Sequence, residues 1–442
     1  MIAVALAVAA APFRIVHAQN QQAPIPQPAA AERELTLDEA LALGKKRNKS
    51  VVAERARFEQ AQTNLDAAWA LLLPTIAAQG KYTRNYTKFE FALPAGTLLI
   101  QPVNQLDGVV SFSAPLIVPA AYPGLKAVKA SVNAAEANFE LSETNVLYGV
   151  AQAFYAAGIA DEVLVARQSN IQVARATLDN AKTRLSAGTV TKVDVDRAEL
   201  ALLRAEQQER EARQGRDQAY RSLSTLIQID TPYRVKVPEA LAPPPAEQPL
   251  ENVLQLRPEF RSFQWSIESA DLEVTTNALK WSPTVSAFGN ARKFNYDNFN
   301  RQRYSWAVGV QLDWVLYDGG NRDAQRHLAA AQREEAQARA SALTDSIRDD
   351  LANGRSLVDT KRQGVFAATR AVELAKETID LVRTQYEAGT VTQVDLLQAQ
   401  DALVGSQEAL AQSRFDLAVA DLTLRKTAGT FPPKSRRWRP VR

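Results

Sequence analysis

The sequence predicts a mainly α-helical chain with a membrane β-barrel portion, built from two structural repeats. Each repeat is expected to hold a strand pair followed by a long coiled-coil helical hairpin. Three observations support this fold class. A 26-residue segment recurs 201 positions later, apolar residues recur every seven positions through both copies, and strand-length segments before the long helices alternate apolar with polar residues.

Composition agrees with long helices. The chain has 442 residues, of which 46% are hydrophobic but only 7% aromatic. Its 52 basic and 49 acidic residues nearly cancel, so the overall charge favours no nucleic-acid partner. It has no cysteine, which excludes disulfides, cysteine-ligated metals and a thiol nucleophile.

The N-terminal residues 1–18 are interpreted as a signal peptide. An apolar run from Met1 to Phe13 precedes Val16-His17-Ala18, whose small residues suit a signal peptidase. No later stretch is expected to be apolar for the roughly 20 residues of a membrane-spanning helix. The basic segment 431–442 is interpreted as a solvated tail.

The repeat is clearest around a shared turn. Residues 178–203 align with residues 379–404 with twelve of 26 positions identical, and AGTVT occurs unbroken in both. Val150, Ala157, Leu164, Ile171, Leu178 and Leu185 mark a heptad in the first copy, and Leu351, Val358, Val365, Val372, Ile379 and Tyr386 mark it in the second. The outgoing helices are expected over about 120–186 and 320–387, each about 100 Å long.

The returning helices differ between the copies. Leu396, Leu403, Leu410, Leu417 and Leu424 keep the heptad in the second, whereas Glu209 and Arg216 interrupt it in the first. A proline-rich stretch, 232–249, is expected to be an extended linker. The predicted divisions are therefore a first repeat over 19–231, the linker, and a second repeat over 250–430.

The membrane strand of the second copy is expected to run over thirteen residues. Its proposed lipid-facing residues are Trp306, Val308, Val310, Leu312 and Trp314, with small and polar residues between them. Val110, Phe112, Ala114 and Leu116 alternate similarly in the first copy. Partner strands begin near Thr75 and Thr284, and the lipid-facing side of the strand containing Val285 is left open. Residues 87–105 and 297–303 are expected to be external loops.

The number of strands predicts the assembly. Four strands cannot close a barrel, and open edges in lipid leave backbone groups unpaired. Three chains would supply twelve strands and remove every edge, leaving an open lumen. A soluble antiparallel sheet with one buried face is the alternative at this step.

The order of these elements resembles the TolC-like outer-membrane efflux protein family, also called the outer membrane factors, across nearly the whole mature chain. The resemblance is carried by LTLDEALALG at 35–44, LLPTIAAQG at 72–80, SPTVSAFG at 282–289, LYDGGNRDA at 316–324 and AGTVTxVD twice. It implies a homotrimer with its barrel in outer-membrane lipid and an α-helical tunnel in the periplasm. It also implies an exit duct of a tripartite efflux pump or type I secretion system.

The same resemblance implies two functional regions at the periplasmic tips. A periplasmic adaptor, or membrane fusion protein, joined to an inner-membrane transporter would dock on Gly188, Thr189, Val190, Thr191, Gly389, Thr390, Val391 and Thr392. The gate would involve Asp395, Gln398, Tyr386 and Asp194. The family has a second aspartate where this chain has Gln398, and an arginine where it has Val391, so the resemblance implies an altered gate with one acidic ring.

Simpler roles remain open for these residues. Asp194 and Asp395 also fit helix N-terminal acids that favour the helix dipole, and Lys192 or Arg184 is available to pair with acids. Gly188 and Gly389 are expected to permit positive φ at the turns.

No enzyme, metal site or cofactor is predicted. The histidines are His17 and His327, and no nucleophile or metal-ligand constellation assembles around them. Gly319-Gly320 is interpreted as a strand-to-helix corner, since no phosphate-loop motif follows it. A soluble periplasmic coiled-coil scaffold is the alternative function, and an adaptor subunit is disfavoured because it would have one hairpin.

Overall fold

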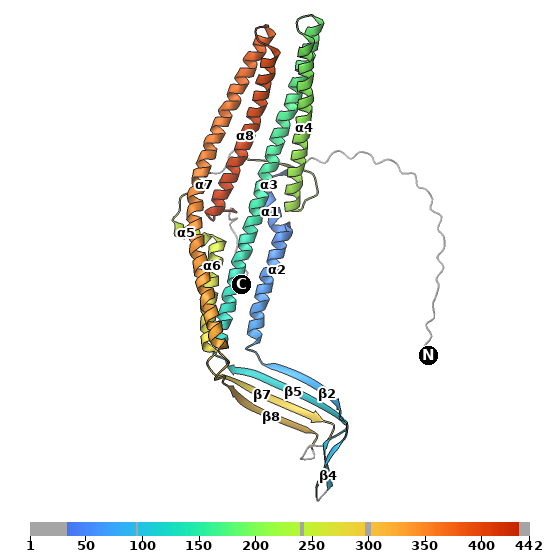
Figure 1. The fold of residues 1–442 in the computed structure, drawn as a ribbon, viewed down its shortest axis with the longest axis vertical. Helices are drawn as coiled ribbons and strands as arrows, with labels where there is room; N and C mark the ends of the chain where they lie inside the picture. Colours follow the sequence, from blue (N-terminus) through green and yellow to red (C-terminus); the bar gives the residue numbers. More distant parts are fainter. Residues whose placement is uncertain (1–32, 94–95, 239–242, 297–301, 433–442) are drawn as a thin grey trace, which may run out of the picture.

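The computed structural model describes residues 33–93, 96–238, 243–296 and 302–432. The predicted signal peptide and nearly all of the basic tail therefore lie outside the described residues. The chain forms a long helical body with a four-stranded sheet at one end and two helical tips at the other (Figure 1).

Each repeat has the same element order. The first comprises α1 (Leu37–Arg47), α2 (Lys49–Ala70), β2 (Thr75–Arg84), β5 (Asn104–Ile117), α3 (Ala121–Ser186) and α4 (Lys192–Ile227). The second comprises α5 (Leu250–Leu256), α6 (Pro258–Leu279), β7 (Thr284–Phe294), β8 (Tyr304–Asp313), α7 (Asn321–Glu387) and α8 (Gln393–Thr427). We call α3–α4 hairpin 1 and α7–α8 hairpin 2.

The long helices α3 and α7 have 66 and 67 residues, so each spans about 100 Å. Toward the tips α3 packs against α4, and toward the sheet it packs against α2; α7 packs similarly against α8 and α6 (Figure 1). Local sequence sets several helix starts. Thr36 with Glu39 forms a capping box before α1, and Pro258 occupies the first turn of α6.

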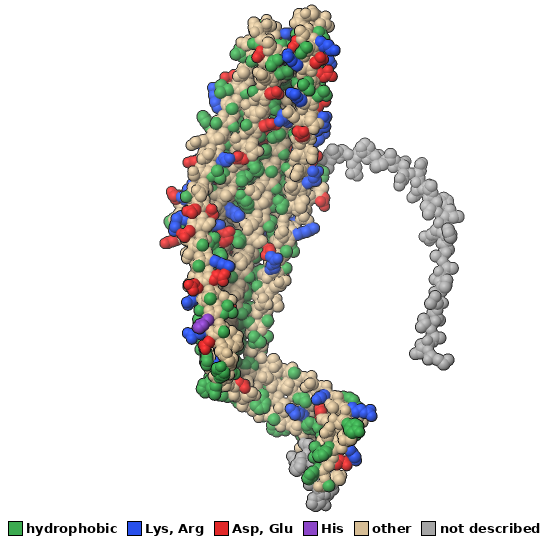
Figure 2. Space-filling model, in the orientation of Figure 1, with side chains coloured by type: hydrophobic (Ala, Val, Ile, Leu, Met, Phe, Trp, Pro, Cys, Tyr) green, Lys and Arg blue, Asp and Glu red, His purple; other side chains and the backbone are tan. Residues whose placement is uncertain are grey.

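The main core lies midway along the body, where α1, α3, α4 and α8 meet. Val150, Phe154, Leu223 and Ile227 are completely buried there. The two charged residues that interrupt the heptad in α4 both form ion pairs. Glu209 pairs with Arg213, and the Nε of Arg216 lies 2.6 Å from Asp161 Oδ1. Figure 2 shows charged side chains of both signs interspersed along the visible helical surface.

One part of α3 is apolar enough, by length and composition, to cross a membrane. The expectation that no such stretch follows the N-terminus is therefore wrong. Leu147, Val150 and Phe154 of this helix belong to the main core, and 33% of its apolar window is buried within the chain.

Two further differences concern short strands. β6 (Tyr233–Val235), inside the predicted linker, pairs in parallel with β1 (Arg33–Leu35), so this end of the linker belongs to a small sheet. β3 (Phe89–Leu93) and β4 (Gly96–Gln101) form a hairpin within the predicted loop 87–105. In the predicted loop 297–303, residues 297–301 lie outside the described residues.

Candidate functional site

The two helical tips have the same turn geometry. Gly188 and Gly389 have φ values of 75° and 77°, as expected for residues that follow a helix in the left-handed region. The backbone N–H of Thr189 donates to the Arg184 carbonyl at 3.0 Å, and Thr390 donates to the Gln385 carbonyl at 2.9 Å. Both threonines are exposed, so the turns present polar groups at the end of each hairpin.

Capping boxes begin both returning helices. Asp395 Oδ2 accepts from the Thr392 backbone N–H at 2.9 Å and from its hydroxyl at 2.6 Å. Asp194 Oδ2 accepts from the Thr191 backbone N–H at 3.0 Å and from its hydroxyl at 2.8 Å. These hydrogen bonds hold the pKa of each carboxyl below the usual aspartate range. Both acids therefore cap their helices, and their role in a gate stays a prediction.

The remaining predicted gate residues lie close to these caps. Gln398 is one turn beyond Asp395 on α8, and both side chains are exposed. Tyr386, in the last turn of α7, is only 7% exposed. One face of the α8 start is thus open and polar, while the tyrosine is packed within the chain.

Arg184 joins the two tips. Its Nη1 donates to the Tyr386 carbonyl at 3.2 Å, its Nη2 donates to the Glu387 carbonyl at 3.4 Å, and its guanidinium lies 4.7 Å from the centre of the Tyr386 ring. The sequence offered Arg184 as a partner for acids, but it instead binds the carbonyl end of α7. No local sequence signal indicates this contact, because its partners lie about 200 residues away in the other repeat.

The sheet at the opposite end has the order β2-β5-β7-β8, with every pair antiparallel. Directly opposed residues project from the same face of such a sheet. The apolar face is formed by Ile76, Ala78, Val110, Phe112, Val285, Ala287, Val308, Val310 and Leu312. The polar face carries Gln79, Lys81, Asp107, Ser111, Asn290, Arg292, Gln311 and Asp313.

The register decides the orientation left open for β7. Val285 is opposite Leu312, and Ala287 is opposite Val310, so both belong to the apolar face. On β8 the side chains of Trp306, Val308, Val310 and Leu312 are 62–72% exposed. An apolar face this exposed lacks its natural surroundings in the isolated chain.

Trp314 was predicted to be a lipid-facing residue of the strand, but β8 ends at Asp313, one residue earlier. Its Nε1 donates to the Trp281 carbonyl at 3.0 Å, which ties it to the end of α6. Arg322 also stacks on the Trp281 ring, 3.9 Å from its centre, and bonds Asp318. These contacts stabilise the strand-to-helix corner, and the strand ends before Leu316, the last residue predicted for it.

No cluster of three potential metal ligands occurs within the part of the chain that the structure describes. His327 is exposed on α7.

The fold is thus a sheet with one exposed apolar face, which suits lipid, joined to helices about 100 Å long that extend away from it. The outer membrane efflux protein family matches residues 40–227 and 250–430. The chain belongs to this family.

Individual relatives agree. The chain is 24% identical to the outer membrane efflux protein BepC of Brucella suis over 89% of this chain and 85% of that protein. It is 23% identical to the alkaline protease secretion protein AprF of Pseudomonas aeruginosa over 73% of this chain and 69% of that protein. The crystal structure of the Campylobacter jejuni CmeC outer membrane channel has a TM-score of 0.75, with 16% identity, over 89% of this chain and 85% of that chain.

The protein is accordingly a channel of the outer membrane, with its helical part in the periplasm. Membership of this family disfavours the soluble scaffold considered from the sequence. BepC, AprF and CmeC are described as efflux, secretion and channel proteins, not as enzymes.

Proposed function

We propose that three copies of this chain form a gated, passive exit duct for small molecules or polypeptides. The proposal depends on one observation: the sheet has one apolar face, and within the described chain its edge strands β2 and β8 each pair on one side only. The duct would have no catalytic residue, because an inner-membrane transporter would supply the energy.

Trimerisation is inferred from the unpaired backbone groups along the two edges of the sheet. Within the described chain β2 pairs only with β5, and β8 pairs only with β7. Each unpaired backbone group exposed to lipid costs several kcal/mol, so an open four-stranded sheet is unstable in a bilayer. Pairing β8 of one chain with β2 of the next, three times, closes a twelve-stranded barrel whose polar faces surround an aqueous lumen.

The gate is proposed at the tips. Asp395 and Gln398 expose a carboxylate and an amide on one face of α8, and Asp194 occupies the matching position in hairpin 1. Threefold symmetry would arrange each as a ring. Arg184 would hold the closed arrangement through Tyr386, since it ties hairpin 1 to the end of α7.

The exposed turns are the proposed adaptor-docking surface. Their threonines are exposed at the extreme ends of both hairpins, with each hydroxyl donating a hydrogen bond within its own tip, while Val190 and Val391 are half-buried. AprF and the pyoverdine export outer membrane protein OpmQ of Pseudomonas aeruginosa are named for secretion and export. These systems support a periplasmic adaptor and an inner-membrane transporter as partners of this chain.

Planar-bilayer recording tests the proposal. Purified protein is expected to migrate as an SDS-resistant trimer before boiling and to conduct ions in discrete steps. A chain that stays monomeric in detergent, or trimers that never conduct even when Asp395 is replaced by alanine, would contradict it.

The capping hydrogen bonds predict how the gate responds to pH. Because bonds to the Thr392 hydroxyl and backbone N–H lower the pKa of Asp395, its charge and its cap are present above about pH 4 and are lost only below the lowered pKa. Conductance is therefore expected to be the same at pH 7 and pH 5. Asp395→Asn should remove any change seen below pH 4, whereas a conductance change centred between pH 5 and pH 7 that this variant abolishes would contradict the prediction.

A further inference from the structure

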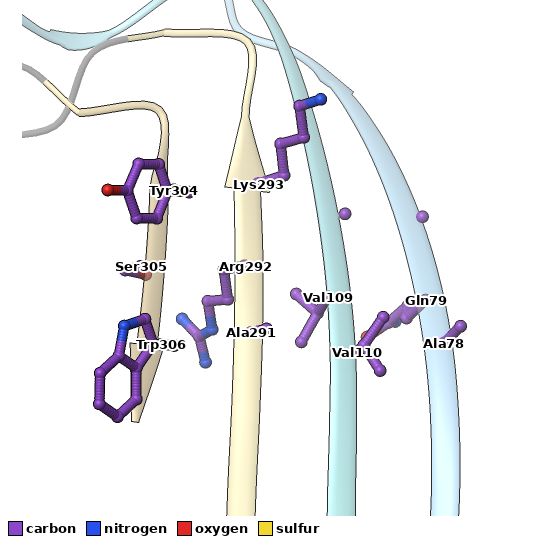
Figure 3. A pocket seen from close by; sticks show the side chains of 12 residues that line it. Ala78, Gln79, Val109, Val110, Ala291, Arg292, Lys293, Tyr304, Ser305 and Trp306 are labelled. Carbon is purple, nitrogen blue, oxygen red and sulfur yellow. The ribbon is translucent and has the colours of Figure 1, made fainter. Parts of the chain in front are cut away.

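A shallow groove lies on the apolar face of the sheet near its loop end. Two rows of opposed residues on this face bound it: Gly80, Gly108, Lys293 and Tyr304 form one row, and Ala78, Val110, Ala291 and Trp306 form the other. The row between them also lines the groove, and its side chains belong to the polar face: Gln79, Val109, Arg292 and Ser305. Figure 3 shows Lys293 and Val110 projecting to the opposite side of their strands from Arg292 and Val109. The groove thus opens on the face that meets lipid.

The groove exists because its floor lacks side chains. A Cβ added to Gly80 meets no atom within 4 Å, and one added to Gly108 meets only the Lys293 carbonyl oxygen at 3.9 Å. Neither glycine is among the residues with positive φ. Packing and backbone geometry therefore do not require glycine here, although glycine weakens a strand; such positions often mark close approach of a ligand.

Charge distinguishes this groove from the rest of the face. Along the four paired strands, the register assigns only two charged side chains to the apolar face, Arg84 and Lys293. Lys293 is exposed and has no acidic partner among the described residues. It lies at the end of β7 that is far from the helices, and since the helices are periplasmic, this end lies in the outer leaflet.

The neighbours of Lys293 fit the interface between lipid tails and headgroups. Tyr304 directly opposes it on β8, and Trp306 follows two residues later. Aromatic rings gather at this depth, and a lysine beside them reaches the headgroups with its ammonium while its methylenes stay in apolar surroundings. The groove below it is lined mainly by small or aliphatic side chains, and so it suits a hydrocarbon chain.

We infer that this groove binds an outer-leaflet lipid with a phosphorylated headgroup, its acyl chain lying over Gly80 and Gly108 and its phosphate on Lys293. The inference rests on the proposed insertion of the sheet into the membrane. It adds to the duct function, which requires no particular lipid.

Native mass spectrometry of the detergent-solubilised protein, titrated with phosphatidylglycerol, tests the inference. Lys293→Gln is expected to lower lipid retention about fivefold, the usual effect of one cation at a lipid surface. Gly108→Leu, which fills the floor while keeping the charge, should also lower retention. The matched control is Lys81→Gln, since Lys81 is on the polar face, and it should retain lipid as the unchanged protein does.

Three results would overturn the inference: equal retention by Lys293→Gln and Lys81→Gln, unchanged retention by Gly108→Leu, or equal binding of a neutral galactosyl diacylglycerol. Displacement of the lipid by millimolar inorganic phosphate would reduce the groove to a simple anion site and would overturn it too. SDS-resistant migration and conductance of each variant separate these outcomes. If conductance persists while lipid binding fails, only this inference falls; if the unchanged protein neither trimerises nor conducts, the proposed duct falls.

Discussion

Val308→Arg is expected to abolish assembly of the channel in the outer membrane. Val308 lies in the middle of β8, is 72% exposed, and belongs to the apolar face opposite Gly289. An arginine on the lipid face at mid-depth costs about 2–4 kcal/mol, and three copies in one barrel cost about 6–12 kcal/mol. The measurement is the amount of SDS-resistant trimer in the outer-membrane fraction.

Ala307→Arg is the matched control for this change. Ala307 is adjacent in sequence but opposes Asn290 on the polar face, where the proposed barrel holds water. The same charge there should leave trimer yield nearly unchanged and alter conductance instead. Equal trimer yield for Val308→Arg and Ala307→Arg would contradict both the assigned faces and the placement of the sheet in lipid.

Arg184→Ala is expected to raise the open probability of the channel about 5- to 30-fold. Its guanidinium donates to two carbonyls at the end of α7 and stacks on Tyr386, and together these contacts are worth about 1–2 kcal/mol. Losing them releases the end of hairpin 2 from hairpin 1. Contacts farther from the tip remain in the variant, among them the ion pair between Arg167 and Glu408. Single-channel recording in planar bilayers measures the change.

Two further arginine variants make this result specific. Arg175→Ala removes a cation that bonds Glu206 within hairpin 1, so it should leave open probability unchanged. Arg184→Lys keeps the charge but loses the forked donors, and an intermediate value is expected. If Arg184→Ala and Arg175→Ala behave alike, the contact between the tips does not hold the gate closed.

Sequence patterns located the long helices to within a residue. The predicted spans 120–186 and 320–387 compare with Ala121–Ser186 and Asn321–Glu387 in the structure. A sustained heptad sets the direction in which each helix packs, and the glycine after each helix gives a local stop. The strand β8 was placed equally well at its start but was extended too far, because Trp314 continues the alternation while its indole bonds the end of α6.

Sequence patterns did not predict the short strands. β6 has three residues, and its hydrogen bonds go to β1 about 200 positions away, so nothing local distinguishes it from the linker. The hairpin of β3 and β4 falls in the segment interpreted as a loop, although Phe89, Phe91 and Leu93 alternate over the five residues of β3.

For the gate, the sequence identified which residues to consider but not what they bind. Asp194 and Asp395 each fit two roles, and only the coordinates reveal the hydrogen bonds to Thr191 and Thr392. Arg184 was offered, beside Lys192, as a partner for acids, but it donates to carbonyl oxygens at a helix end, which attract cations as well.

The sequence alone determined the repeat, the helical hairpins, the alternating strands and the family, because these depend on periodicities that each segment carries within itself. Only the tertiary structure decided which way β7 faces, where Arg184 binds and that Gly80 and Gly108 lie in one row with Lys293. These features depend on strand register and on contacts between the repeats, where residues far apart in the chain meet. No local periodicity encodes such contacts.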